Sequence, residues 1–233
     1  MGRLDISNQN KGRAVMPLVI QVFIGLWMAG VVVASFLYLP PAKNFAVPEA
    51  AKLIIFHVPC AMISVIAYLV SSVYAIAYLL RANAASDIKS AASAAIGFIF
   101  TALATVTGMV FAKMEWGAAW NWDPRETSIL MLMFVYAAYF ALRGAIPAFA
   151  VRARVSAAYN IIACLVMPYL MFVLPRMMGG LHPSDTLSHK SALSPEYRIV
   201  LFASMIGFSL IYLWIFRIQV RKGEYRLSRR KHE

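Results

Sequence analysis

The chain has 233 residues, of which 61% are hydrophobic and only 14% charged, and its mean hydropathy is +0.69. Soluble domains are about 45–50% apolar and about 25% charged, so this composition excludes an ordinary soluble domain and indicates an integral membrane protein. The net charge of +12 does not indicate nucleic-acid binding here. The basic residues of the chain cluster at loop ends and in the C-terminal tail. This distribution is typical of the residues that orient a membrane protein and contact anionic lipid headgroups.

The two cysteines, Cys60 and Cys164, each stand alone in an apolar segment. The sequence has no Cys-x-x-Cys pair, no zinc-binding spacing and no Cys-x-x-Cys-His motif for covalent haem attachment. Both cysteines are therefore expected to be free and buried as small hydrophobic side chains. Any cofactor of this protein is expected to be held without a covalent bond.

Apolar segments separated by proline, polar or basic residues predict an all-α membrane protein that forms a single integral membrane domain over residues 1–233. The first segment is interpreted as a retained helix, because no small-x-small cleavage site follows it. Pro168 predicts a kink within the fifth segment. Six transmembrane helices are expected, approximately at residues 18–39, 53–80, 91–112, 127–146, 156–174 and 199–218.

Six membrane crossings place both termini on the same side of the membrane. Most lysines and arginines fall in the termini and in the two even-numbered loops, which predicts that both termini are cytoplasmic. The odd-numbered loops then lie on the periplasmic side. They bring His57, His182, His189 and the loop at residues 113–126 to one face of the membrane.

That loop carries Trp116, Trp120 and Trp122 within seven residues, followed directly by charged side chains. One or two tryptophans are usual where a helix leaves the bilayer. Three at this density indicate a platform for a flat, largely apolar ligand, although Trp116 alone would be an ordinary interfacial residue.

The end of the same loop has the sequence of a helix start. Asp123 suits the N-cap, Pro124 the first helical position, and Glu126 the third position of a capping box. Asp123 either caps the helix only or also contacts the ligand. Arg125 and Glu126 either serve the ligand or pair with each other or with neighbouring helices.

A porphyrin fits these residue types, because it offers a broad apolar face, two carboxylates and an iron that takes axial ligands. Neutral imidazole is a common axial ligand, so His57 and His182 are candidates to bind iron from opposite sides. The alternatives are hydrogen-bonded histidines at helix ends, or His189 as the second ligand. Candidate cations for the propionates are Arg125, Arg176, Lys113 and Arg198.

The residues Trp116-Gly117-x-x-Trp120-x-Trp122-Asp123-x-Arg125-x-Thr127 resemble the WWD signature of haem-handling proteins in cytochrome c biogenesis, the CcmC, CcmF and CcsA proteins. A histidine in each neighbouring external loop follows the same order. With six spans and this length, the whole chain resembles the CcmC family, haem exporter protein C of the cytochrome c maturation system.

The resemblance implies a haem-binding protein, not an enzyme, in the bacterial inner membrane. Haem b would be held non-covalently and transiently at the periplasmic face, with His57 and His182 as the axial ligands. The WWD signature (Trp116, Gly117, Trp120, Trp122, Asp123 and Arg125) would present the haem edge. The haem would pass to the haem chaperone CcmE, and the ABC transporter subunits CcmA and CcmB with the small protein CcmD would complete the assembly.

Three other functions are compatible with parts of this pattern. A CcsA-like subunit of a cytochrome c synthetase would ligate haem to apocytochrome c, but such subunits are longer and carry further membrane histidines. A b-type cytochrome would place facing histidines deep within its helices. A small-molecule transporter would show broken helices and a polar site at the membrane midplane.

Overall fold

The computed structural model describes residues 16–42, 45–182 and 193–229. All regular structure in these ranges is helical, and six of the helical segments are long and apolar enough to cross a membrane. The prediction of an all-α protein with six transmembrane helices is therefore confirmed. The candidate spans are Leu18–Tyr38, Pro48–Arg81, Ala84–Trp116, Pro124–Ala145, Phe149–Met178 and Pro195–Arg229.

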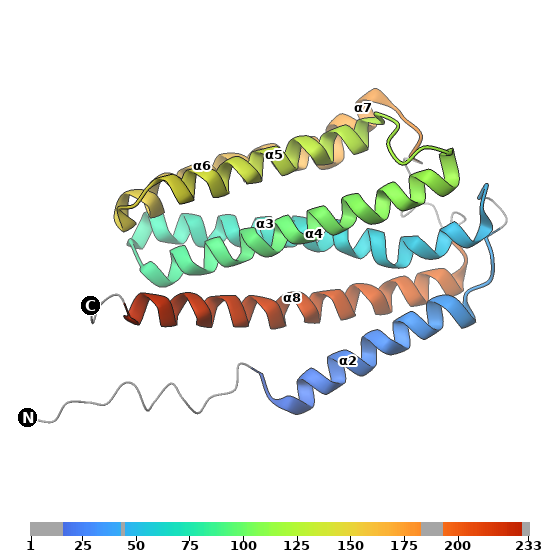
Figure 1. Ribbon diagram of the computed structural model, residues 1–233, viewed down its shortest axis with the longest axis horizontal. Helices are drawn as coiled ribbons and strands as arrows, with labels where there is room; N and C mark the ends of the chain where they lie inside the picture. The colour runs from blue at the N-terminus through green and yellow to red at the C-terminus, as the bar shows by residue number, and fades with distance from the viewer. Residues whose placement is uncertain (1–15, 43–44, 183–192, 230–233) are drawn as a thin grey trace, which may run out of the picture.

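The helices form three stacked pairs (Figure 1). The long helices α3 and α4 lie in the middle and pack along each other, with α5 and α6 on one side and α8 and α2 on the other. Several spans combine two or three elements. Their bounds are α2 Leu18–Val33 with η1 Ala34–Tyr38, η2 Pro48–Leu53 with α3 Ile54–Arg81, α4 Ala84–Trp116, α5 Pro124–Ala145, α6 Phe149–Pro168 with η3 Tyr169–Val173 and α7 Leu174–Met178, and α8 Pro195–Arg229.

Close packing in the middle of the bundle depends on small and hydroxylated residues. Tyr68 of α3 stacks on Tyr136 of α5, with ring centroids 3.6 Å apart, and its hydroxyl is 2.8 Å from that of Thr101 in α4. Gly97 leaves room for the Tyr68 ring, because a Cβ there would lie 2.7 Å from it. Such polar contacts between helices, across small residues, are typical of helix packing in lipid.

The two cysteines are free and buried as predicted, and the helical winding changes after Pro168. Cys60 and Cys164 are both free and buried. Helix α6 ends at Pro168, and the chain continues as the π-helical turn η3 before α7. Proline cannot donate the backbone hydrogen bond of a regular helix, which explains the change of winding at this residue.

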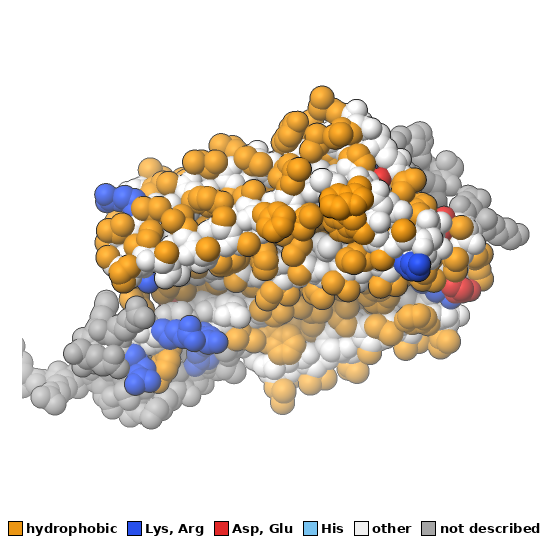
Figure 2. Space-filling model, turned by 45° about the horizontal axis from the view of Figure 1, so that its top comes forward, with side chains coloured by type: hydrophobic (Ala, Val, Ile, Leu, Met, Phe, Trp, Pro, Cys, Tyr) orange, Lys and Arg blue, Asp and Glu red, His pale blue; other side chains and the backbone are white. Residues whose placement is uncertain are grey.

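The outer surface of the bundle is largely apolar (Figure 2). Large hydrophobic side chains such as Leu37, Leu80, Leu165 and Phe202 are more than two-thirds exposed. Exposed apolar surface of this extent is stable when it faces lipid rather than water. The described chain is therefore a multi-pass membrane protein.

The up-and-down path of the chain brings four segments to one end of the bundle, the end at which α7 lies in Figure 1. These segments are the start of α3, the end of α4, the start of α5 and the residues after α7. They carry His57, the tryptophan-rich segment and His182, which are more than 120 residues apart at their extremes.

Candidate functional site

His57 lies in the first turns of α3, and α4 holds its ring. The Nδ1 atom is 3.0 Å from the carbonyl oxygen of Ala104 and 3.1 Å from Oγ1 of Thr107. A carbonyl oxygen only accepts, so Nδ1 carries the hydrogen and donates it, and Nε2 keeps its lone pair. Gly108 provides the space for this ring, because a Cβ there would lie 2.9 Å from Cε1 of His57.

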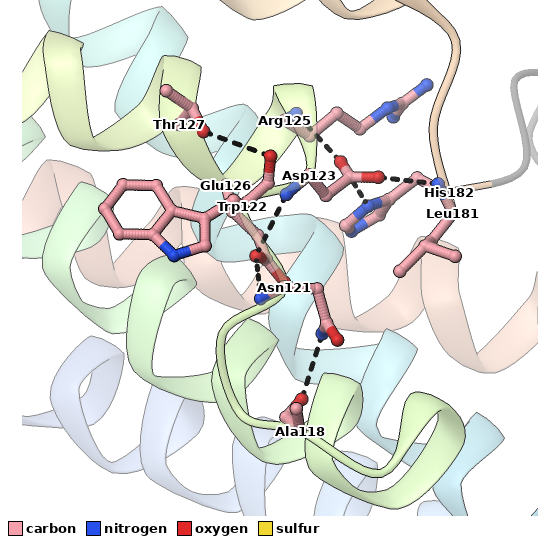
Figure 3. A network of polar contacts seen from close by, with 9 residues as sticks. All are labelled: Ala118, Asn121, Trp122, Asp123, Arg125, Glu126, Thr127, Leu181 and His182. Atoms are coloured by element: carbon pink, nitrogen blue, oxygen red, sulfur yellow. Dashed lines mark hydrogen bonds and ion pairs between the residues drawn. The ribbon is translucent and has the colours of Figure 1, made fainter.

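His182 follows α7, and a buried carboxylate holds its ring. Its Nδ1 atom lies 3.1 Å from Oδ1 of Asp123, whose side chain is only 1% exposed. The Leu181 N–H donates to Oδ2 of Asp123 at 2.6 Å (Figure 3). With the carboxylate ionised, Nδ1 of His182 donates to it and Nε2 again keeps its lone pair. Carboxylate–imidazole pairs of this kind orient histidines that bind metals.

A glycine allows the segment after α7 to approach Asp123. A Cβ at Gly180 would collide with Oδ2 of Asp123 and would lie 3.1 Å from the Pro124 ring. The preceding Gly179 has φ +65°, a left-handed conformation that favours glycine. The two glycines therefore bring His182 onto the start of α5.

The charges of this pair follow from their surroundings. Burial lowers the pKa of His182 below its ordinary value of 6.5, although the Asp123 carboxylate acts in the opposite direction. Burial alone would raise the pKa of Asp123, but the backbone N–H groups of Arg125 and Leu181 and the His182 ring lower it. At neutral pH the imidazole is therefore neutral and the carboxylate is ionised, the states in which His182 can bind a metal through Nε2.

Asp123 also begins α5, as the sequence predicts. Its Oδ1 accepts the N–H of Arg125 at 2.9 Å. Asp123 and Glu126 form a capping box, with Pro124 at the first helical position. The Glu126 carboxylate accepts the N–H groups of Asn121 at 2.7 Å and of Asp123 at 3.4 Å. One carboxylate, that of Asp123, thus holds the helix start, the segment after α7 and the His182 ring.

The three predicted tryptophans occupy different positions around the histidines. Trp116, the last residue of α4, meets the His182 ring edge to face with 4.8 Å between centroids. Gly117 then ends α4 with φ +82°. Trp120 borders the space between the histidines. Trp122 has φ +55°, is 73% exposed and touches Trp120, so it points away from that space.

The two imidazoles open into one pocket. Its volume is about 680 Å³ including the open space at its mouth. Most of the lining is apolar, and the polar groups are few. The lining residues are His57, Ala61, Ala104, Thr105, Gly108, Met109, Trp120, Arg125, Glu126, Ser128, Ile129, Leu170, Met171, Pro175 and His182.

The candidate cations do not have equal access to this pocket. Arg125 is among the lining residues. Lys113 instead donates to the carbonyl oxygen of Gly117 at 2.8 Å, and Arg176 donates to that of Phe172 at 2.7 Å. Arg198, in α8, is outside the lining. Among the described residues, Arg125 is thus the predicted cation best placed to meet an acidic group in the pocket.

The pocket suits a metal that brings most of its own ligands. Within the described ranges, no group of three or more His, Cys, Asp or Glu side chains could hold a bare metal ion. A planar macrocycle such as a porphyrin fills four positions around its iron and leaves two for the protein. Two imidazoles with free Nε2 atoms can fill those two positions. The alternative ligand His189 lies outside the described residues.

Several residues of the site are not apparent from the sequence. Ala104, Thr107 and Gly108 support His57 from α4, where they belong to an apolar run without a distinctive pattern. Met109 and Met171 also line the pocket, and they too lie in apolar segments where no sequence motif distinguishes them. The Gly179-Gly180 pair just before His182 is the one sequence signal that could indicate a close approach of backbone to the site.

Fold and pocket together define a class: a multi-pass membrane protein whose helices bring two imidazoles into one largely apolar pocket at one end of the bundle. The family model described as CcmC, heme exporter protein C, matches residues 7–233. The chain belongs to this family. It is 30% identical over 220 residues to the heme exporter protein C of Rhodobacter capsulatus, covering 91% of this chain and 87% of the relative.

Two further relatives show the same similarity over shorter stretches. The heme exporter protein C of Paracoccus denitrificans is 28% identical over 186 residues, which cover 76% of this chain and 77% of the relative. That of Escherichia coli K12 is 32% identical over 160 residues, 69% of this chain and 64% of the relative.

Proposed function

We propose that this protein binds haem b at the periplasmic face of the bacterial inner membrane and delivers it to the haem chaperone CcmE during c-type cytochrome biogenesis. His57 and His182 would bind the haem iron from opposite sides through Nε2. One observation carries this proposal: both rings donate Nδ1–H to fixed acceptors and line the same pocket. The names of the relatives, heme exporter protein C, support haem as the ligand.

The remaining signature residues have roles that follow from their positions. Trp120 provides an apolar wall and Arg125 a cation for a propionate. Trp116 steadies the His182 ring, and Gly117 allows the chain to turn directly after it. The exposed Trp122 lies beside Trp120, where it can contact the haem edge or the acceptor protein.

Non-covalent binding matches a protein that gives its ligand away. The pocket offers two axial ligands and an apolar lining, and it contains no cysteine that could form a thioether bond. We therefore assign the protein a binding and transfer role rather than an enzymatic one. The ABC transporter subunits CcmA and CcmB and the small membrane protein CcmD are its proposed partners, together with CcmE.

An absorption spectrum of the purified protein tests haem binding. Protein from haem-replete cells should show a Soret band that acid–acetone extraction removes. Replacing His57 or His182 with Ala should weaken or shift the band, whereas the matched control His189→Ala should leave it unchanged. A colourless wild-type preparation would contradict the proposal, and loss of the band in His189→Ala alone would reassign the second ligand.

Transfer and orientation need separate measurements. Trp122→Ala should retain the Soret band but lower the amount of haem-loaded CcmE, because its side chain lies outside the pocket. Normal haem-loaded CcmE in this variant would remove Trp122 from the transfer step. Single cysteines placed in the segment at residues 117–122 should react with a membrane-impermeant thiol reagent added to the periplasmic side. Labelling from the cytoplasm would contradict the orientation.

A further inference from the structure

A second hollow lies at the opposite end of the bundle from the two histidines. Its volume is about 980 Å³ including its open side. It lies over the start of α4, between the α5–α6 turn and the C-terminal part of α8. The lining residues are Asp87, Ile88, Ala91, Ala92, Ala95, Arg143, Phe149, Arg152, Gln219, Lys222, Gly223, Arg226 and Leu227.

One wall of this hollow is a basic face of α8. Gln219, Lys222, Gly223 and Arg226 are spaced by three and four residues, which places them on one side of the helix. Gly223 lets α8 approach α4 closely, because a Cβ there would lie 2.5 Å from Cγ2 of Ile88. Lys222 and Arg226, on either side of Gly223 along this face, line the hollow.

The opposite wall adds two arginines whose charges differ in availability. Arg143 donates two hydrogen bonds to the carboxylate of Asp87, at 2.7 and 2.9 Å, so these two charges compensate each other. Asp87 is the acidic residue among the described lining residues. Arg152 lies in the first turn of α6, with its guanidinium 5.3 Å from the Phe149 ring. Arg152, Lys222 and Arg226 thus leave the hollow with a net positive charge.

The start of α6 adds to this positive potential. No side chain in the described parts of the chain caps the α6 N-terminus. The first N–H groups of a helix point outward and carry partial positive charge, so they favour an anion near Arg152. A helix start alone would be weak support for a site, but here it adjoins three cationic side chains that line the same hollow.

The floor of the hollow is apolar and built mainly from alanines. Ile88, Ala91 and Ala95 of α4 present methyl groups between the two basic walls. Figure 2 shows Lys and Arg side chains gathered at one end of the molecule, beside a largely hydrophobic flank. A ligand that satisfies both surfaces has an anionic head and a hydrocarbon body.

We propose that this hollow is a binding site for an anionic phospholipid. The phosphate group lies between Arg152 of α6 and Lys222 and Arg226 of α8, and an acyl chain follows the alanines of α4. Basic pockets between transmembrane helices bind acidic lipid headgroups in this way. The site is distinct from the histidine pocket and does not depend on haem binding.

The test uses the full-length protein in neutral detergent, with bound phosphatidylglycerol counted by native mass spectrometry. The pocket variant combines Arg152→Gln, Lys222→Gln and Arg226→Gln. A matched control removes the same charge at exposed positions outside the hollow, with Arg81→Gln, Arg154→Gln and Arg217→Gln. A double variant, Lys222→Gln with Arg226→Gln, changes only exposed side chains of α8 and guards against misfolding.

We expect one phosphatidylglycerol to remain bound to the wild type and to the control, and phosphatidylcholine not to replace it. Its affinity should fall at least about tenfold in the pocket variant and severalfold in the double variant. Equal weakening in the control would show diffuse charge attraction and overturn the proposal. Displacement by inorganic phosphate, against chloride at matched ionic strength, would identify a free-phosphate site instead and would also overturn it.

Discussion

Replacing Asp123 with Asn tests whether this carboxylate prepares His182 for iron. The Asp123 side chain is 1% exposed, and its Oδ1 accepts Nδ1–H of His182 at 3.1 Å. The amide of Asn has nearly the same shape but no charge, so it orients the ring less firmly and makes Nε2 a weaker donor to iron. Loss of such an outer hydrogen bond typically lowers metal affinity about 10–100-fold, which is the loss of haem affinity expected here.

The same substitution separates the imidazole from the helix cap. Asn and Asp are about equally good N-cap residues, so Asp123→Asn keeps the helix cap. Its amide NH2 cannot accept the Leu181 N–H that Oδ2 of Asp123 accepts, so this variant should lose the stability of that one hydrogen bond, about 1–3 kcal/mol. Asp123→Ala removes the cap as well, because the N–H of Arg125 loses its acceptor. Asp123→Ala should therefore lose about 1 kcal/mol of stability more than Asp123→Asn, together with haem affinity. Thermal unfolding of the haem-free protein measures the loss of stability independently of the loss of haem affinity.

The assay is a haem titration followed at the Soret band for the wild type, Asp123→Asn and Asp123→Ala. Glu49→Gln is a suitable control, since Glu49 is an exposed acid that pairs with Lys52 away from the histidine pocket. Wild-type haem affinity in Asp123→Asn would refute the role of the carboxylate in preparing His182. If Asp123→Asn lost as much stability as Asp123→Ala, the change in haem affinity would reflect general damage to the start of α5.

Three further predictions follow from the same contacts. Gly108→Ala places a methyl group 2.9 Å from the His57 ring and should weaken haem binding about tenfold, whereas Gly25→Ala, with open space around it, should not. Asp87→Asn breaks a largely buried ion pair and should cost about 3–5 kcal/mol in thermal unfolding, with haem affinity per folded protein unchanged. Haem affinity should be constant above pH 6.5 and should fall as the pH drops through the lowered pKa of His182, because only the neutral imidazole binds iron. A loss of haem affinity on raising the pH above 7 would contradict this direction.

The sequence was sufficient for the parts of the structure that depend on local chemistry. Asp123, Pro124 and Glu126 form the expected capping box, because an N-cap acid and a matching residue at the third position satisfy backbone N–H groups wherever they occur. The meeting of His57 and His182 follows from the alternation of long apolar segments, since an up-and-down bundle brings alternate loops to one end. Neither inference requires knowledge of side-chain packing.

The support of each imidazole could not be predicted, because it comes from segments distant in sequence. The Ala104 carbonyl that fixes His57 is one of many in α4, and only the approach of α3 makes it an acceptor. The position at which α4 ends could not be predicted either. The hydropathy falls at Lys113, so the predicted span ends at residue 112, but the helix continues to Trp116. That extra turn is what places Trp116 against the His182 ring.

The two histidines differ in how they are held, and this difference bears on release. His57 is part of a transmembrane helix and donates to the backbone of another, so it moves only if α3 and α4 separate. His182 follows α7, outside any long helix, and its ring depends on one carboxylate and one indole. Shifting His182 therefore disturbs far fewer packed side chains than shifting His57. If His57 and His182 bind haem as proposed, one fixed and one displaceable ligand would allow both binding and release without unpacking the membrane helices.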